Sequence, residues 1–447
     1  METRRRWLLS VGGLAALALA DSSSRAAAQT TKPLSAAQSQ RWRGELNEVL
    51  RDNILRFWLE KSIDREQGGY CMHFDSAGVR KAENTKAIVT QARTLWLFAR
   101  ASRNDFEGQG IPAREELLKA AQHGFAFLRD HMWDAEHGGF FWMVDPASGK
   151  VPMPAKHLYG QSFALYALAE YYRASQLPEV LALADRLVER LERHAYDTRY
   201  GGYEEYFERD WRKPPEGTQG YMGPSHWKLM NTHLHLMEAF TTYLDALETP
   251  LARRRLEELV QIQSNAVVRK KLGGCTDKYL RDWTPVTDGA NGRVSYGHDI
   301  ENVWLLADAN RALGHSSYPL RDLFTMLWDY TLAHGYDAGE GGIYYAGEPG
   351  EPASNRDKSW WVQAEALVSA LTMVEMTGER RYLDVFENTW NLVKTKMVDR
   401  ESGEWHPSIP AAGSPRGDKA QNWKAGYHNG RAMIECMKLL KRMEVRG

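Results

Sequence analysis

The sequence has few cysteines and no excess of charge of one sign. Its three cysteines, Cys71, Cys275 and Cys436, are far apart and odd in number, which excludes a disulfide framework and a zinc-ligand spacing. Lys and Arg total 57 against 58 Asp and Glu, so the formal net charge is -1. This balance gives no electrostatic basis for binding nucleic acid or a membrane surface. We therefore expect neither a nucleic-acid partner nor a stable membrane association.

Several catalytic motifs are also missing. No Gly-x-Gly-x-x-Gly opens a helix after a strand, and neither a Gly-Lys-Ser/Thr loop nor a Gly-x-Ser-x-Gly elbow occurs. These absences disfavour nucleotide chemistry and a serine hydrolase, and we expect no cofactor. In contrast, the chain has 16 Trp, 20 Tyr and 14 His. Such a composition suits a deep pocket for a flat, partly apolar ligand such as a sugar ring.

The sequence has no hydrophobic run long enough to span a bilayer, and its clearest apolar run, residues 8–20, is at the N-terminus. Arg4-Arg5-Arg6 precedes that run and Ala26-Ala27-Ala28 follows it. This pattern predicts an export signal over residues 1–28, of the twin-arginine type, with an ordinary secretory signal as the alternative. We expect a periplasmic or secreted protein whose residues 29–447 form a single domain.

A short signature recurs along the chain: an acidic residue, three further residues, then Gly-Gly and an aromatic or apolar residue. Its first glycines are at positions 68, 138, 201 and 341, with weaker copies at 273 and 403. Six copies at a spacing of 62 to 72 residues are an internal repeat, and the segments after the Gly-Gly pairs resemble short hairpins.

Each repeat contains two windows with helical spacing of apolar residues. The twelve windows are 36–63, 84–102, 113–132, 157–175, 178–195, 225–247, 249–268, 296–313, 317–335, 358–377, 379–397 and 425–443. Windows rich in Arg, Lys and Glu alternate with windows rich in Ala, Gly, His and Trp. This alternation predicts an all-α fold, an (α/α)6 barrel with six inner and six outer helices and short hairpins in the long loops.

Polar and aromatic residues cluster in the first turns of the predicted inner helices. We expect these residues to meet at one mouth of the barrel, where helix N-termini favour a developing anion. The cluster consists of Arg93, Tyr159, Asn231, His235, Glu238, His298, Glu301, Trp361, Glu365, Trp423, His428 and Arg431.

His235 and Glu238 are three residues apart, so they share one helical face, and the carboxylate can fix the tautomer of the imidazole. A hydrogen-bonded core histidine is the alternative interpretation. His298 and Glu301 repeat the spacing. The chain lacks the matching carboxylate helices of a di-metal bundle, so we expect no metal. Trp361 and Trp423 can each stack on a sugar ring or pack in the core.

Several runs resemble the N-acylglucosamine 2-epimerase superfamily, and most closely its cellobiose 2-epimerase branch. They occur in family order from about residue 40 to the end of the chain. The runs are Ala-Arg-Thr-Leu-Trp (92–96), Leu-Tyr-Gly-Gln-Ser-Phe-Ala-Leu-Tyr-Ala-Leu-Ala (158–169), Met-Asn-Thr-His-Leu-His-Leu-Met-Glu-Ala (230–239), Ser-Tyr-Gly-His-Asp-Ile-Glu (295–301), Trp-Trp-Val-Gln-Ala-Glu-Ala (360–366) and Trp-Lys-Ala-Gly-Tyr-His-Asn-Gly-Arg (423–431). Ala425-Gly426 departs from the Cys-Pro of the cellobiose epimerases.

The resemblance implies an (α/α)6 barrel and a role for each matching residue. His235 and His428 would be the acid/base pair, supported by Glu238, with His298 as a third pocket histidine. Arg93 would hold sugar oxygens near the reacting centre. The remaining members of the cluster are assigned to substrate binding: Tyr159, Asn231, Glu301, Trp361, Glu365, Trp423 and Arg431.

The implied reaction is 2-epimerisation of a free reducing sugar, from glucose type to mannose type, with a β-1,4 disaccharide such as cellobiose as the expected substrate. Ring opening and proton transfer at C2 through an enediolate suit histidines near neutral pH. Alternatives are an aldose–ketose isomerase, an N-acylglucosamine 2-epimerase, a non-catalytic glycan-binding protein, and a glycoside hydrolase or lyase. The partner is a small carbohydrate, and no feature of the sequence specifies an oligomeric state.

Overall fold

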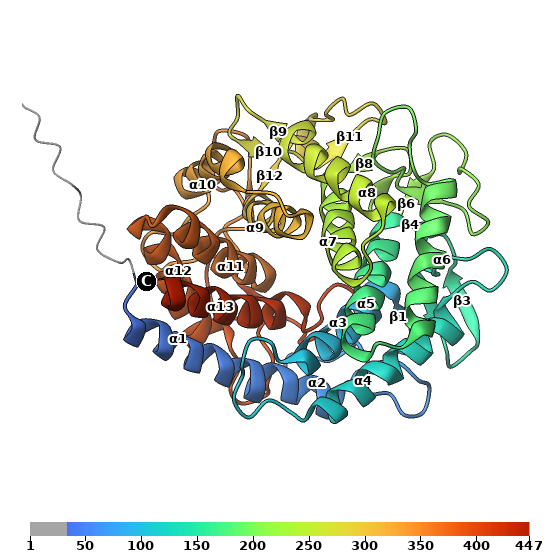
Figure 1. The fold of residues 1–447 in the computed structure, drawn as a ribbon, viewed down its shortest axis with the longest axis horizontal. Helices are drawn as coiled ribbons and strands as arrows, with labels where there is room; N and C mark the ends of the chain where they lie inside the picture. Colours follow the sequence, from blue (N-terminus) through green and yellow to red (C-terminus); the bar gives the residue numbers. More distant parts are fainter. Residues whose placement is uncertain (1–33, 447) are drawn as a thin grey trace, which may run out of the picture. The chain divides into compact units, whose positions relative to one another are not determined.

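The computed structural model describes residues 34–446, so the predicted export signal lies outside the described residues. Helices form two concentric rings (Figure 1). Each inner helix packs against the next, and the last packs against the first, which closes the ring. The inner helices are α3 (Ile88–Arg103), α5 (Leu158–Ser175), α7 (Met230–Ala246), α9 (Tyr296–Leu313), α11 (Trp360–Thr377) and α13 (Tyr427–Arg446). The predicted (α/α)6 barrel is therefore confirmed.

The outer ring consists of amphipathic helices. In α6, for example, Val180, Leu183, Leu187 and Leu191 are buried at helical spacing while the charged residues face outward. The first outer position is continuous from α1 (Ala36–Glu48) through a π-helical segment (Val49–Leu55) into α2 (Arg56–Lys61). The others are α4 (Arg114–Phe127), α6 (Pro178–His194), α8 (Pro250–Gln261), α10 (Arg321–His334) and α12 (Arg380–Leu392).

The twelve predicted windows match these helices closely. The window 225–247 begins too early, because residues 228–229 form a strand before α7 begins at Met230. Three outer helices end in π-helical turns, which the apolar spacing does not distinguish from α-helix. None of the helices described by the structure has the length and apolar character needed to cross a membrane.

Short antiparallel strands lie at the end of the barrel where the inner helices begin. Five of them, β1, β4, β8, β12 and β14, end at the residue before an inner helix. In chain order the strands are β1 (Lys86–Ala87), β2 (Met143–Asp145), β3 (Lys150–Met153), β4 (Lys156–His157), β5 (Tyr206–Phe207), β6 (Gln219–Gly220), β7 (Gly223–Pro224), β8 (Lys228–Leu229), β9 (Val268–Arg269), β10 (Gly274–Cys275), β11 (Lys278–Tyr279), β12 (Val294–Ser295), β13 (Ala346–Gly347), β14 (Lys358–Ser359) and β15 (Ser408–Ile409).

The Gly-Gly repeat is a turn held by a buried ion pair. In the first copy Gly68 and Gly69 have φ of 77° and 64°, a conformation that favours glycine. Asp64 accepts backbone N–H groups within the turn, and Lys86 of β1 donates to it at 2.9 Å. The same ion pair recurs as Lys156–Asp134, Lys228–Asp197, Lys358–Asp337 and Lys419–Asp399. Each pair fixes a turn against the start of an inner helix or the loop before it.

A polar side chain from the inner helix completes most of these turns. Gln91 accepts the N–H of Tyr70 and donates to its carbonyl, at 2.9 and 2.8 Å. Gln161 and Gln363 repeat this pairing in their own turns. In the third turn His233 takes the glutamine's place, because its Nε2 accepts the N–H of Tyr203 at 3.0 Å. His233 therefore belongs to the repeat.

Candidate active site

His235 lies on α7 and is paired with Glu238, as their spacing predicts. Its Nδ1 is 3.0 Å from Oε2 of Glu238, and both side chains are buried. The imidazole packs against Phe163 at 4.6 Å between ring centroids. Because a carboxylate accepts hydrogen bonds, Nδ1 carries the proton and the lone pair is on Nε2. This imidazole is therefore set up to exchange a proton at Nε2.

His428, at the start of α13, forms a second pair of the same kind. Its Nδ1 is 2.6 Å from Oε1 of Glu365 on α11. The other oxygen of Glu365 accepts the indole N–H of Trp304 at 2.8 Å. The sequence analysis assigned Glu365 to the sugar, but its carboxylate is 1% exposed and both oxygens are bound to protein groups. Glu365 thus supports His428 as Glu238 supports His235.

Arg431 joins the two pairs from beneath. One amino group, Nη1, contacts Glu238 and the Tyr427 hydroxyl, and the other donates to Glu365 at 2.7 Å and to Glu301 at 2.8 Å. Tyr427 itself donates to Glu238 at 2.6 Å. Arg431 and Glu301 were expected to bind the sugar, yet both are about 1% exposed and bonded to each other. They form a buried, hydrogen-bonded polar layer below the histidines.

The spacing of His298 and Glu301 does not produce a pair, since Glu301 is turned toward Arg431. Donor atoms of Glu301, Glu365 and His428 lie within 4.8 Å of one another, a grouping that could hold a cation. In this structure the guanidinium of Arg431 supplies positive charge to both carboxylates. The Arg431 side chain thereby occupies the position next to Glu301 and Glu365 that a cation would take.

Burial dominates the protonation of this cluster. It lowers the pKa of His235 and of His428, and the positive charge of Arg93 lowers both further. Neutral imidazole, the form that accepts a proton from carbon, is thus favoured. Burial also raises the pKa of Glu301 to about 8 and raises that of Glu365, where the charge of Glu301 adds to the effect.

Arg93, on α3, is a buried cation between the aromatic side chains of the site. Its Nη2 donates to the Tyr159 hydroxyl at 3.0 Å and its Nη1 to the Trp423 carbonyl at 2.6 Å. The guanidinium carbon is 4.2 Å from the centroid of the Phe163 ring. Arg93 therefore fixes the loop that carries Trp423 and brings a positive charge to the site.

The aromatic side chains predicted to hold a sugar lie at the hairpin end of the barrel. Trp423 is 40% exposed, with Trp142 and Tyr159 each 6.0 Å away between ring centroids. Trp361 packs against His298 at 4.7 Å and lies 5.8 Å from His428. Trp423 has the most open ring face of this group.

Asn231, which was expected to bind the substrate, has an unused polar atom. Oδ1 of Asn231 has no hydrogen-bond partner within residues 34–446. His298, the third pocket histidine, is only partly buried, and its ring packs against Trp361. Two supporting residues were missed by the sequence analysis. Tyr427 adjoins His428 in a matching run and could have been noticed, whereas Trp304 gives no local signal.

The chain is similar to known proteins over most of its length. The family model for N-acylglucosamine 2-epimerase (GlcNAc 2-epimerase) matches residues 68–432. Among curated proteins, a cellobiose 2-epimerase of Bacteroides fragilis is 31% identical over 88% of this chain and 98% of its own length. A cellobiose 2-epimerase of Ruminococcus albus is 32% identical over 88% and 97%.

Solved structures share the fold. The cellobiose 2-epimerase from Spirochaeta thermophila superposes with a TM-score of 0.80 at 34% identity, covering 92% of this chain and 99% of that one. A more distant curated relative is a D-mannose isomerase of Marinomonas mediterranea, 24% identical over 87% of this chain and 95% of its own. The family match spans most of the chain, and the chain belongs to the N-acylglucosamine 2-epimerase family.

Proposed function

We propose that this protein is a carbohydrate 2-epimerase that interconverts glucose-type and mannose-type sugars at a free reducing end. The expected substrate is a β-1,4 disaccharide such as cellobiose, as the names of the relatives support. The observation that carries the proposal is the presence of two histidines, His235 and His428, each bonded at Nδ1 to its own glutamate. Inversion at C2 needs one group that removes a proton and another that returns it to the opposite face.

The proposed mechanism begins with opening of the hemiacetal, which places an aldehyde next to C2. The Nε2 atom of one histidine accepts the C2 proton, leaving an enediolate, and the protonated Nε2 of the other returns a proton to the opposite face. Arg93 and the N-termini of the inner helices stabilise the negative charge, as an oxyanion hole does. His298 and Asn231 bind sugar hydroxyls. This chemistry needs no cofactor or metal.

Trp361 and Trp423 are the proposed supports for the sugar rings. Trp361 lies between His298 and His428 and would hold the reacting sugar, while the more exposed Trp423 would hold the second ring of a disaccharide. Indole faces pack well on the apolar face of a pyranose. Glu238, Glu301, Glu365 and Arg431 act through the histidines and do not touch the sugar.

An aldose–ketose isomerase is the second candidate, because D-mannose isomerases are among the relatives. Moving a proton between C1 and C2 on one face of an enediol needs only one acid/base group. Two histidine–glutamate pairs therefore favour the epimerase. A ketose product would favour the isomerase, and turnover confined to N-acetylglucosamine would favour an N-acylglucosamine 2-epimerase.

The chain offers a matched pair of variants for the test. His233→Gln introduces the residue that the same position has in three other repeats, so the variant should fold and keep its activity within a few-fold. His235→Gln lies two residues away and should remain folded but lose about 10²–10⁴-fold in epimerisation rate, the usual contribution of an acid/base group. His428→Gln should behave like His235→Gln. Normal turnover by a folded His235→Gln or His428→Gln protein would overturn the proposal.

We also propose that residues 1–28 direct export, by the twin-arginine route. Fractionation of cells expressing the full chain should recover a shortened protein outside the cytoplasm, and replacing Arg4 and Arg5 with Lys should retain it inside. Export that is unaffected by the two Lys substitutions would point to an ordinary secretory signal.

A further inference from the structure

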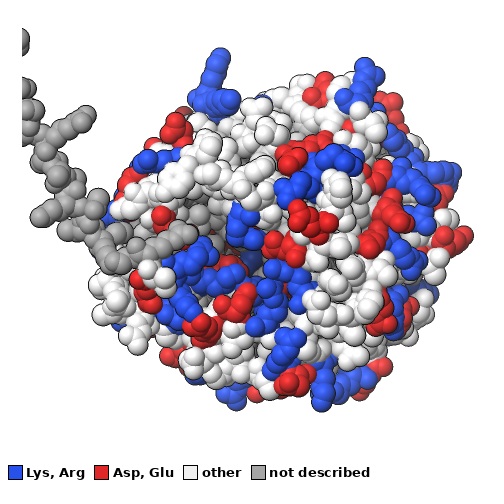
Figure 2. Space-filling model, in the orientation of Figure 1, with Lys and Arg blue, Asp and Glu red and all other residues white. Residues whose placement is uncertain are grey.

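A large cavity lies at the end of the barrel opposite the hairpins, where the inner helices end. It has a volume of about 610 Å³ and is lined by seven basic and seven acidic side chains. Figure 2 shows such side chains gathered around a hollow near the middle of the face toward the viewer. The wall of this cavity is therefore strongly polar.

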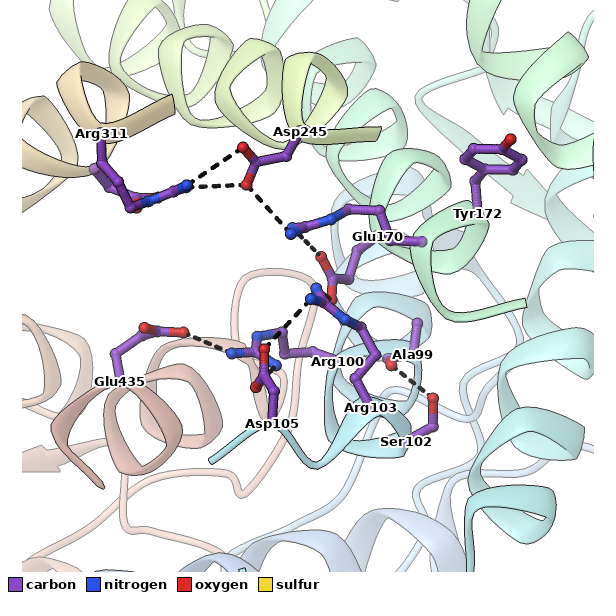
Figure 3. A network of polar contacts seen from close by, with 12 residues as sticks. Ala99, Arg100, Ser102, Arg103, Asp105, Glu170, Tyr172, Asp245, Arg311 and Glu435 are labelled. Carbon is purple, nitrogen blue, oxygen red and sulfur yellow. Dashed lines mark hydrogen bonds and ion pairs between the residues drawn. The ribbon is translucent and has the colours of Figure 1, made fainter. Parts of the chain in front are cut away.

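Ion pairs between inner helices line the mouth of this cavity (Figure 3). Arg311 of α9 binds Asp245 of α7 at 3.0 Å, Arg103 of α3 binds Glu170 of α5 at 2.8 Å, and Arg100 of α3 binds Glu435 of α13 at 3.0 Å. These charges are satisfied by one another. The ion pairs therefore tie the helix ends to one another and leave none of these charges free for a ligand.

The cavity reaches the layer beneath the histidines. Glu238, Arg431 and Trp304 are among its lining residues, and Nε of Arg431 has no hydrogen-bond partner among residues 34–446. Glu365 and His428 are not among the residues that line it. Arg431 is itself only 1% exposed, so it closes the inner end of this cavity, and a smaller side chain at this position would extend the cavity toward the histidine–glutamate pairs.

We propose that Arg431 is a positioning residue that holds both histidine–glutamate pairs at once and couples them. Its Nη1 serves Glu238, the partner of His235, and its Nη2 serves Glu365, the partner of His428. The guanidinium fixes each carboxylate so that each imidazole keeps its proton on Nδ1 and presents Nε2 to C2. The proposal rests on the proposed function, since it assigns both pairs to one proton exchange at C2.

The fork of the guanidinium is essential to this role. A lysine at this position would keep the charge, but its single ammonium group cannot reproduce the planar two-sided contact. In one turnover one histidine gains the proton from C2 and the other gives a proton to C2, so the two pairs must be aligned together. Loss of Arg431 should therefore slow epimerisation, and because the equilibrium constant is unchanged, kcat/KM should fall by the same factor in both directions.

The far cavity permits a test by chemical rescue. Arg431→Ala should lose about 100-fold in kcat from both the glucose-type and the mannose-type sugar, as a misplaced catalytic group does. The dependence of kcat/KM on pH should change, and guanidinium ion added at non-denaturing concentration should restore part of kcat. Lys438→Ala, on the rim of the same cavity, should keep wild-type activity and show no response to guanidinium.

Two further variants keep the test decisive if Arg431→Ala does not fold. Arg431→Lys should show an intermediate loss of kcat, and Tyr427→Phe, which removes one hydrogen bond to Glu238 and leaves the guanidinium in place, should show a smaller loss than Arg431→Ala. Folded Arg431 variants with wild-type kcat and an unchanged pH profile would overturn the proposal. Absence of epimerase activity in the wild-type protein would instead overturn the proposed function. If Arg431 served only stability, its variants would unfold more easily but keep the wild-type kcat per folded molecule.

Discussion

Replacing Lys156 with Met tests whether buried ion pairs hold the Gly-Gly turns. The side chains of Lys156 and Asp134 are both 0% exposed, and Nζ is 3.0 Å from Oδ2. Removing one member of a buried pair costs about 3–5 kcal/mol, because the remaining charge is left uncompensated. Arg209 still contacts Asp134 and is 45% exposed. We therefore expect a loss of about 3 kcal/mol, the lower end of that range.

The titration of Asp134 reports on all of its partners together. Burial raises its pKa, but hydrogen bonds from Arg209 and Lys156 outweigh burial and lower the pKa from 3.8 to about 2. This difference corresponds to about 2 kcal/mol of stability. Because the folded pKa is below the unfolded one, this contribution is present above pH 3.8 and is lost as the pH falls through about 2. Arg209 and Lys156 share this contribution, and burial lowers the pKa of Lys156 itself to about 8, so the pair does not fully offset the burial of the ammonium group.

The assay is urea unfolding followed by tryptophan fluorescence at pH 7, for Lys156→Met, Asp134→Asn and the double variant. The double variant should be less destabilised than the sum of the single changes, because neither charge is then left without its partner. Lys213→Met, which removes an exposed lysine paired with Glu204, is the control and should have little effect. A Lys156→Met cost below about 1 kcal/mol, or strict additivity, would refute the reasoning.

Three further predictions concern the site and its supports. Tyr427→Phe removes a hydrogen bond to the Glu238 carboxylate, worth about 1.5–3 kcal/mol, so kcat should fall by about 10- to 100-fold in a steady-state assay. Trp423→Ala should raise the KM for a disaccharide with little change in kcat. A variant whose KM for the disaccharide equals that of the wild-type protein would contradict the stacking role of Trp423. Burial raises the pKa of Glu205 to about 8, above its unfolded value, so stability should fall as pH rises from 4.5 to 8. Glu205→Gln should reduce this dependence of stability on pH, measured by thermal unfolding. The same dependence in the variant and the wild-type protein would argue against a raised pKa of Glu205.

The fold could be predicted from the sequence because its signals are local. Apolar spacing places the helices within a few residues, and the Gly-Gly pairs mark the turns, where glycine readily adopts the positive φ that is needed. The same spacing could not identify Lys156 as the partner of Asp134, since the contact joins a strand to a turn 22 residues earlier. A contact between residues that a loop separates produces no periodic pattern in the sequence.

The site could be predicted only in part, for the same reason. The pairing of His235 with Glu238 follows from a spacing of three residues on one helix. His428 and Glu365 are 63 residues apart, and their contact depends on how α11 packs against α13. Arg431 and Glu301 stand in runs that resemble the family, which indicates that they belong to the site but does not separate a sugar contact from a buried support.

Proton NMR of the purified protein in D2O tests the central claim most directly. Cellobiose, mannobiose, glucose, mannose and N-acetylglucosamine should each be supplied, with His235→Gln as the inactive control. The account predicts that the mannose-type epimer of a disaccharide appears with deuterium at C2, and that neither occurs with the variant. A ketose product, cleavage to smaller sugars, or no exchange at C2 with any of the five would contradict it.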